Sequence, residues 1–173
     1  RVVRKRPLEA FSDSIVGAAF RSLRAGLEPQ FRDSNLNAVL VTSVSSSEGK
    51  TTVASLFAES LARIGMNVLL VDGDLKRPGI SRITKLPGSP GLATVLRDAT
   101  PWQEAVSPGW TPNLSILPTT SDAEGGDLLA KRFEGVLGQM RREFDLVVID
   151  GAPLIGADDA RTVAPMADGV VLV

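Results

Sequence analysis

The sequence contains no cysteine, no histidine and no tyrosine among its 173 residues. Without cysteine, disulfides and thiolate chemistry are excluded, and a reducing compartment is compatible with the composition. Without histidine, the chain has neither a histidine base nor a histidine metal cluster. The net charge is only −1, so we expect no nucleic-acid partner. No apolar run approaches the ~18 residues that a membrane span requires.

The residues that are present predict a single α/β domain over 1–173. Hydrophobic residues make up 43% of the chain, which is enough for a sizeable core. Apolar runs rich in β-branched residues predict buried strands, and stretches with a helical period separate these runs. The predicted strands are 37–42, 68–72, 114–118, 146–150 and 169–173. The predicted helices are 14–27, 50–65, 91–98, a long helix that Asp127 caps, and 158–166.

Strands that alternate with helices favour a mainly parallel sheet with helices on both faces. In such sheets, ligands bind at the carboxyl ends of the strands. Residues 73–90 hold three prolines and three glycines and are predicted to be a loop. The helix over 50–65 should bury one face and stop at Gly65; that face consists of Val53, Phe57, Leu61 and Ile64. The helix after Asp127 should bury Leu129, Phe133, Val136, Leu137 and Met140.

The stretch VTSVSSSEGKTT, residues 41–52, ends like a phosphate-binding loop, and it lies between a predicted strand and a predicted helix. Gly49 lets the backbone approach a phosphate, Lys50 reaches the β and γ phosphates, and Thr51 offers a hydroxyl to Mg²⁺. The strict pattern G-x-x-x-x-G-K-[ST] wants glycine where this chain has Val44. The alternative is a serine-rich turn with an ordinary N-cap. The residues predicted to hold ATP or ADP are Ser45, Ser46, Ser47, Glu48, Gly49, Lys50, Thr51 and Thr52.

Three aspartates end two of the other predicted strands. Asp72 and Asp74 follow one strand, and two like charges at a strand end are costly unless a cation such as Mg²⁺ joins them. One of the two could also accept a proton from an attacking hydroxyl or water. Asp150 ends a second apolar run, the usual place of a Mg²⁺ partner. An Asp- and Gly-rich turn, or a capping aspartate, is the alternative for each, but three such elements in this order favour a nucleotide site.

These three motifs, in this order, resemble the cytoplasmic domain of the bacterial tyrosine kinases (BY-kinases) of exopolysaccharide and capsule systems. GKTT resembles their Walker A motif, LLVDGDLKRP their Walker A′ motif and FDLVVIDGAP their Walker B motif. FRSLRAGL, GLATVL and ADGVVLV resemble further parts of that domain, so the resemblance covers most of the chain. DLKRP is the most specific element, because the chromosome-partitioning and septum-positioning ATPases share the other motifs. Those ATPases commonly carry an extra lysine where this chain has Ser45.

The resemblance implies a P-loop fold and a role for each motif residue. Lys50 would neutralise the β and γ phosphates, Thr51 would bind Mg²⁺, and Asp150 would hold it through water. Asp72 and Asp74 would serve the metal and the incoming hydroxyl. The product would be phosphotyrosine on a neighbouring subunit's tail. The family also implies a homo-oligomer, a partner in the polysaccharide polymerase and export machinery, and a cytoplasmic domain tethered to the bacterial inner membrane.

Two features of the chain bear on this resemblance. The family often forms rings through an E-x-x-R-x-x-R helix; Arg21 and Arg24 fit, but Ala18 stands where the glutamate is expected. An interface role and a solvated helix face are both open for the two arginines. Four of the first six residues are basic, so residues 1–13 are either a solvated tail or a juxtamembrane segment of a longer membrane protein.

Three functions are therefore in competition. The first is a Mg-ATP-dependent protein-tyrosine kinase domain, with possible ATPase activity, that regulates polysaccharide polymerisation and export. The second is a nucleotide-binding switch for assembly of the polysaccharide co-polymerase, with little transfer chemistry. The third is a partitioning-type ATPase. Trp102 and Trp110 are expected to pack over the sheet edge rather than to dock a partner.

Overall fold

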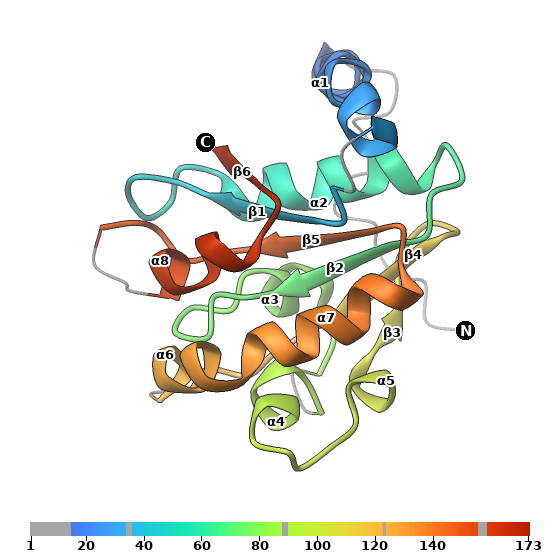
Figure 1. The fold of residues 1–173 in the computed structure, drawn as a ribbon. Helices are drawn as coiled ribbons and strands as arrows, with labels where there is room; N and C mark the ends of the chain where they lie inside the picture. Colours follow the sequence, from blue (N-terminus) through green and yellow to red (C-terminus); the bar gives the residue numbers. More distant parts are fainter. Residues whose placement is uncertain (1–14, 34–35, 88–89, 123, 156–158) are drawn as a thin grey trace.

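The computed structural model of the chain is built around a six-stranded β-sheet (Figure 1). It describes residues 15–33, 36–87, 90–122, 124–155 and 159–173, so the basic tail predicted at 1–13 lies outside the described residues. The strands are β1 (Ala38–Thr42), β2 (Val68–Asp72), β3 (Ser107–Pro108), β4 (Leu114–Leu117), β5 (Leu146–Asp150) and β6 (Gly169–Leu172). Their order in the sheet is β3-β4-β2-β5-β1-β6, and all neighbours are parallel except β3 and β4. The prediction of a mainly parallel sheet is confirmed.

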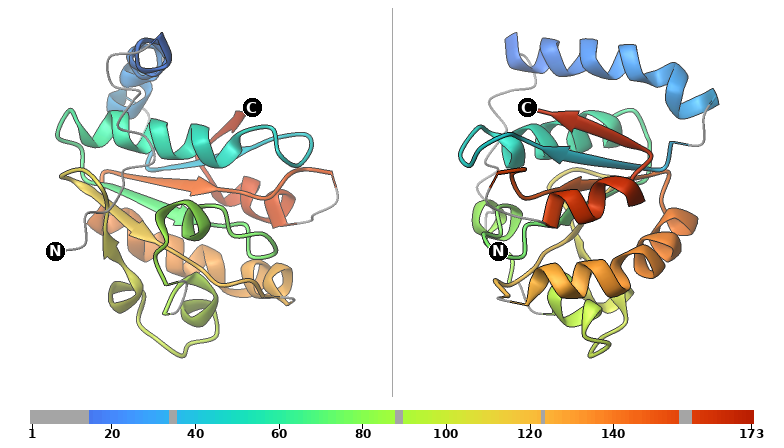
Figure 2. Two further views of the ribbon diagram at one scale, coloured as in Figure 1. Left: turned by 180° about the vertical axis from the view of Figure 1, so that it is seen from behind. Right: turned by 60° about the vertical axis from the view of Figure 1, so that its left-hand side comes forward.

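Helices cover both faces of the sheet, as predicted (Figures 1 and 2). The helices are α1 (Ile15–Asp33), α2 (Lys50–Ala62), α3 (Ile80–Thr84), α4 (Leu92–Leu96), α5 (Trp102–Ala105), α6 (Gly125–Leu128), the π-helical turn η2 (Leu129–Phe133), α7 (Glu134–Glu143), α8 (Asp159–Val163) and the 3₁₀ turn η3 (Ala164–Met166). Helices α2 and α3 pack on one face, and α4, α5, η2, α7 and α8 pack on the other. Helix α1 lies against the outer side of α2, where the Arg24 guanidinium donates to the Ser60 carbonyl (3.2 Å).

The three central strands supply both cores because their side chains alternate between the two faces. In β2, Leu69 and Val71 enter one core cluster, and Val68 and Leu70 enter the other. Every residue of β1, β2 and β5 is buried. A parallel strand that is covered on both sides needs such a continuous apolar run, and this requirement made these strands readable from the sequence.

Four local predictions need correction or extension. Helix α1 continues to Asp33, beyond the predicted end at residue 27. Helix α2 ends at Ala62, so Ile64 leaves its apolar face and is 48% exposed. The chain turns away from the helix axis at Gly65, which has a left-handed φ of 93°. Asp127 lies in the first turn of α6 and not at the N-cap, which is Glu124.

The predicted loop over 73–90 contains the short helix α3. Its Ile80 is fully buried in the core with α2. The Asp72 carboxylate accepts hydrogen bonds from the backbone N–H groups of Gly79 (3.2 Å) and Ser81 (2.9 Å), at the start of this helix. Helix α3 therefore depends on a capping group from the end of β2, which the local sequence pattern does not reveal.

The tryptophans pack as predicted. Trp102 is 4% exposed and lies 6.0 Å from Phe144 between ring centroids. Trp110 packs against the other core, and its indole N–H donates to Glu59 (3.0 Å). Within the ranges that the structure describes, no helix is both long and apolar enough to cross a bilayer.

Candidate functional site

The three predicted motifs meet at the carboxyl ends of β1, β2 and β5. Strand β5 lies between the other two, and Asp150 is in register with Val41 on one side and Asp72 on the other. A pocket of about 700 Å³ opens at this edge. Its walls are formed by Ser46, Ser47, Gly49, Lys50, Thr51, Thr52, Asp74, Lys76, Arg77, Arg82, Ile83, Pro153 and Ile155. Folding thus brings together residues, such as Ser46 and Ile155, that are more than a hundred positions apart in the chain.

The loop between β1 and α2 has the backbone shape of a phosphate-binding loop. Ser47 and Gly49 both adopt left-handed conformations, with φ of 67° and 96°. Gly49 is the N-cap of α2 and has no side-chain cap, so the first N–H groups of the helix are left for a ligand. The lack of a side-chain cap favours a phosphate-binding loop over the alternative of a serine-rich turn with an ordinary N-cap.

Val44 fits this loop although the strict pattern has glycine there. Its side chain is 44% exposed, and its φ is not positive, so the backbone does not require glycine. Its carbonyl accepts the Ile155 N–H (3.0 Å), which ties the loop to the segment after β5. The Glu48 carboxylate accepts the Ser45 N–H (2.7 Å) across the loop. Glu48 thus shapes the backbone here; among the predicted ligands, Ser45 and Glu48 do not line the pocket.

Asp150 is the group best suited to a divalent cation. It is 1% exposed, and neither of its carboxylate oxygens has a hydrogen-bond partner in the described part of the chain. Burial raises its pKa from 3.8 to about 7; the nearby Thr51 hydroxyl and Lys50 ammonium oppose this rise, and the charges of Asp72 and Asp74 add to it. A buried carboxylate without a partner is costly, and a bound cation would remove that cost.

Asp72 is held more tightly than Asp150. Its two oxygens accept the Gly79 N–H, the Ser81 N–H and the Ser81 hydroxyl (3.0 Å). Burial raises its pKa to about 6, against the effect of these hydrogen bonds, and Asp74 adds a smaller increase. Its lone pairs are largely in use, so it is better arranged to position α3 and to contact a metal through water than to bind one with both oxygens.

Asp74 lines the pocket itself. Its side chain accepts the backbone N–H of Arg77 (2.9 Å) through one oxygen, and the residue is 8% exposed. That bond uses one carboxylate oxygen of Asp74, and the lone pairs of the other oxygen can accept a hydrogen bond from an incoming hydroxyl. Lys50, also 8% exposed, is the first residue of α2 and lies in the same pocket.

No group of three or more acidic side chains that could hold a metal alone occurs in the described ranges. This fits magnesium in nucleotide sites, which takes one or two protein ligands and completes its shell with phosphates and water. The predicted metal ligands Thr51, Asp72 and Asp150 lie together, since a Cβ added at Gly79 would collide with the Thr51 hydroxyl and lie 3.0 Å from Asp150 Oδ2. Gly79 is thus needed for close approach.

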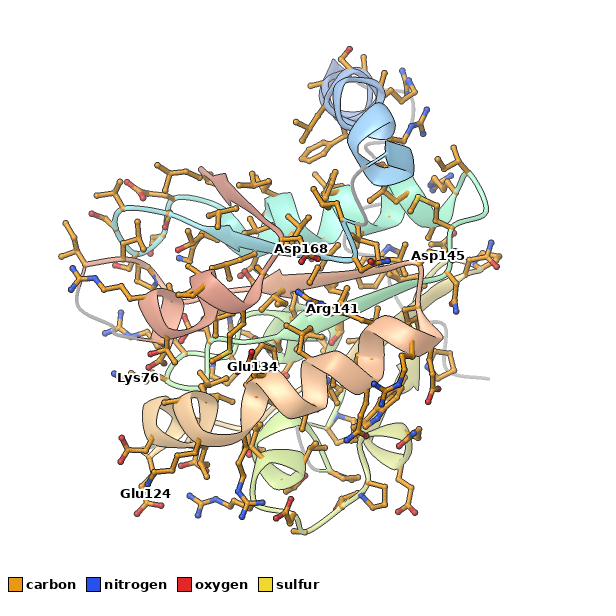
Figure 3. All side chains as sticks on the ribbon, in the orientation of Figure 1. Lys76, Glu124, Glu134, Arg141, Asp145 and Asp168 are labelled. Atoms are coloured by element: carbon orange, nitrogen blue, oxygen red, sulfur yellow. The ribbon has the colours of Figure 1, made fainter. Side chains whose placement is uncertain are left out.

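Sequence reasoning missed several residues in the pocket wall or beside it. Gly79 and Ser81 lie beside the pocket, in the segment predicted to be a loop, and both donate hydrogen bonds to the Asp72 carboxylate. Lys76, Arg77 and Arg82 add three cations to the pocket wall. Figure 3 shows Lys76 at the end of the sheet opposite to Asp145, and its ammonium lies 3.8 Å from the buried Asp159. The run KRPGISR carries these charges, but no periodicity places them in a pocket.

The chain was compared with known proteins in sequence and in structure. No model of a protein family matches the chain. The succinoglycan biosynthesis transport protein ExoP of Rhizobium meliloti (strain 1021) is 28% identical over 178 residues, which cover 100% of this chain and 22% of that protein. Tyrosine-protein kinase YwqD of Bacillus subtilis (strain 168) is 29% identical over 162 residues, with 92% of this chain and 68% of that protein covered. The chain thus spans about a fifth of ExoP and about two thirds of YwqD.

Solved structures are also similar to this chain. The BceF tyrosine kinase domain has a TM-score of 0.84 and 26% identity, covering 95% of this chain and 67% of that one. The septum site-determining protein MinD of Pyrococcus horikoshii OT3, solved with Mg-ADP, has a TM-score of 0.68 and 25% identity, covering 79% of this chain and 57% of that one. The fold is that of the P-loop NTPases, and the kinase domain matches more of the chain than the septum protein does.

Proposed function

Because the chain is a relative of the bacterial tyrosine kinases in sequence and in fold, we propose that it is a Mg-ATP-dependent protein-tyrosine kinase domain. One observation carries the proposal: Asp72 and Asp150 are buried side by side in register, beside Lys50 and Thr51 at the start of α2. Positioned charge of this kind is what phosphoryl transfer requires of a protein, because the reaction needs little covalent help.

Each residue has a defined part in the proposed reaction. The backbone N–H groups of the loop and the Lys50 ammonium bind the phosphate oxygens of ATP. Thr51 and Asp150 hold magnesium, with Asp72 assisting, and magnesium when bound neutralises charge on the transferred phosphoryl group. Asp74 accepts the proton of the tyrosine hydroxyl. The hydroxyl oxygen then forms a bond to the γ-phosphorus, the bond from the γ-phosphorus to the β–γ bridging oxygen breaks, and ADP leaves with that oxygen.

The test uses labelled Mg-ATP and a tyrosine-bearing peptide, because the chain has no tyrosine of its own. Substitution Lys50→Met should lower transfer about 10²- to 10³-fold, since a ligand of the reacting phosphates is lost. Its circular dichroism and melting should stay close to those of the parent chain, since Lys50 lines the pocket and is in neither core cluster. A matched substitution at the exposed Lys131, outside the pocket, should leave transfer unchanged. Full turnover by Lys50→Met, or its unfolding, would contradict this role.

The same assay separates the competing functions. Phosphotyrosine that depends on Lys50 supports the kinase. Tight ATP binding with release of inorganic phosphate and no labelled tyrosine supports a switch for assembly of the co-polymerase. The partitioning-type ATPase has the weaker support, because the septum protein covers less of this chain than the kinase domain does.

The setting of the domain is part of the proposal. The name of ExoP connects that relative with succinoglycan biosynthesis and transport, and we extend this to polysaccharide polymerisation and export for the present chain. It would work at the cytoplasmic side of the bacterial inner membrane, tethered to a membrane part of the same or a partner chain, as a homo-oligomer. Arg24 already bonds within the chain to Ser60. An oligomer that depends on α1 would therefore involve its exposed residues, and light scattering of an Arg21→Glu variant tests this.

A further inference from the structure

The outer wall of the pocket carries an unusual concentration of positive charge. Lys76, Arg77 and Arg82 line it together with Lys50, and Asp74 is the one acidic side chain on the pocket wall as described. The chain as a whole has a net charge of −1. The excess of cations is therefore local to the pocket, and it attracts anionic ligands to this edge of the sheet.

Two of these cations have no partner in the described part of the chain. No ion pair and no side-chain hydrogen bond involves Arg77 or Arg82 there. Four arginines away from the pocket pair with acids: Arg63 with Glu59, Arg97 with Asp122, Arg132 with Asp98 and Arg141 with Asp168. Arg77 and Arg82 lack such a pair and also line the pocket, so their guanidinium groups are available to an anionic ligand from outside the chain.

Part of the pocket wall is apolar. Ile83, Pro153 and Ile155 line it, and Ile155 is 64% exposed although it is a large hydrophobic residue. Asp74 lines the same pocket as the phosphate loop and the cations, and its carboxylate accepts the Arg77 N–H (2.9 Å). An aromatic ring can lie along the apolar side with its hydroxyl toward Asp74, while charged neighbours in its chain meet the arginines.

We propose that Lys76, Arg77 and Arg82 form an acceptor-binding surface that selects an acidic peptide, in which carboxylates or phosphoryl groups flank the reacting tyrosine. The inference rests on the proposed function, since it names the acceptor class of the same site. The triphosphate already has Lys50 and the N–H groups of the loop. The three further cations follow Asp74 in the chain. Asp74 is the residue proposed to receive the proton of the acceptor hydroxyl.

Binding of unreactive peptides tests the charge preference without any chemistry. Two fluorescein-labelled peptides carry phenylalanine at the acceptor position, flanked by glutamates in one and by glutamines in the other. Their affinities are measured by anisotropy on the full chain with saturating Mg-ADP. The acidic peptide should bind about tenfold more tightly, because its carboxylates can form ion pairs with the exposed cations of the pocket wall. Raising the salt concentration should reduce the difference.

Charge-reversal variants test whether the preference for the acidic peptide depends on the cations of the pocket wall. Arg82→Glu should abolish the preference, and Arg82→Gln should reduce it. Arg142→Glu serves as the control, because Arg142 is an exposed residue near the end of α7 and does not line the pocket. Circular dichroism of each variant establishes that it is folded.

Three results would overturn the proposal. The first is equal affinity of the parent chain for the two peptides, and the second is a preference that survives Arg82→Glu. The third is a loss of Mg-ADP affinity in Arg82→Glu with the peptide preference intact, because the arginine would then be a nucleotide ligand. Failure of the proposed function shows separately, as acidic peptide binding without phosphotyrosine when the same peptide carries tyrosine.

Discussion

Replacing Asp150 by asparagine should make the nucleotide-free chain more stable at neutral and alkaline pH. Asp150 is 1% exposed, has no hydrogen-bond partner for its oxygens in the described residues, and has a pKa raised to about 7 by burial. Because the native carboxyl holds its proton more tightly than the unfolded one, the free energy of unfolding falls as the pH rises through this range. The group's stabilisation is fully present below about pH 4 and is lost as the pH rises through about 7.

The magnitude follows from that pKa. A rise from 3.8 to about 7 corresponds to about 4 kcal/mol of unfavourable free energy for the charged form, at about 1.4 kcal/mol per pH unit. The asparagine amide is buried without a partner, which costs about 1–3 kcal/mol. The net gain for Asp150→Asn should be about 1–3 kcal/mol near pH 8, or roughly 3–9 °C in melting temperature for a chain of this length. Near pH 5 the gain should vanish, because the parent carboxyl is then protonated.

The assay is thermal and urea unfolding at about pH 8 and about pH 5 in chelator, followed by the fluorescence of Trp102 and Trp110. Asp145→Asn is the matched control, because Asp145 precedes the same strand at its other end and accepts the Asn67 N–H (2.8 Å), which asparagine can also accept. That substitution should change stability little at either pH. A loss of stability in Asp150→Asn at pH 8, or a gain equal at both pH values, would refute the reasoning.

Three further substitutions test the site and its support. Asp74→Asn should lower kcat for phosphoryl transfer about 10²- to 10⁴-fold and change the Kd of Mg-ATP little; equal losses of both would argue against a proton acceptor. Gly79→Ala should weaken Mg-nucleotide binding about tenfold in calorimetry, because the new Cβ collides with the Thr51 hydroxyl; an unchanged affinity would show that this contact does not matter. Arg141→Met should lower the free energy of unfolding by about 1–2 kcal/mol, since Arg141 bonds to the Met166 carbonyl (2.6 Å) and to Asp168 (3.1 Å) (Figure 3). Nucleotide affinity should be kept in Arg141→Met, and its loss would contradict the separation of the two regions.

The strands were readable from the sequence because burial on both faces leaves a strong local signal. Strands β2 and β5 occupy the predicted residues 68–72 and 146–150, each a run of apolar residues that ends in an aspartate. The order of elements then predicted that Asp72 and Asp150 would meet, and they lie in register on adjacent strands. The relation to the bacterial tyrosine kinases, which the motifs suggested, is confirmed by the comparisons.

What the sequence did not reveal depends on contacts that form only in the folded chain. The backbone N–H groups of Gly79 and Ser81, at the start of α3, donate to the Asp72 carboxylate, whereas the prolines and glycines of residues 73–90 predict a loop there. The short antiparallel strand β3 has only two residues and is paired through β4. The cations of the pocket wall lie in a segment without periodicity, and only the fold places Arg82 beside the phosphate loop. The roles of the individual site residues stay predictions.

The most direct test of the account is the fate of the γ-phosphate of labelled Mg-ATP with an excess of an acidic tyrosine peptide. The measurement is the ratio of label in phosphotyrosine to label in inorganic phosphate, for the parent chain and for Asp74→Asn. The account predicts that most of the label enters phosphotyrosine and that Asp74→Asn loses this product. Label that appears only as inorganic phosphate, at the same rate with and without peptide, would contradict a tyrosine kinase.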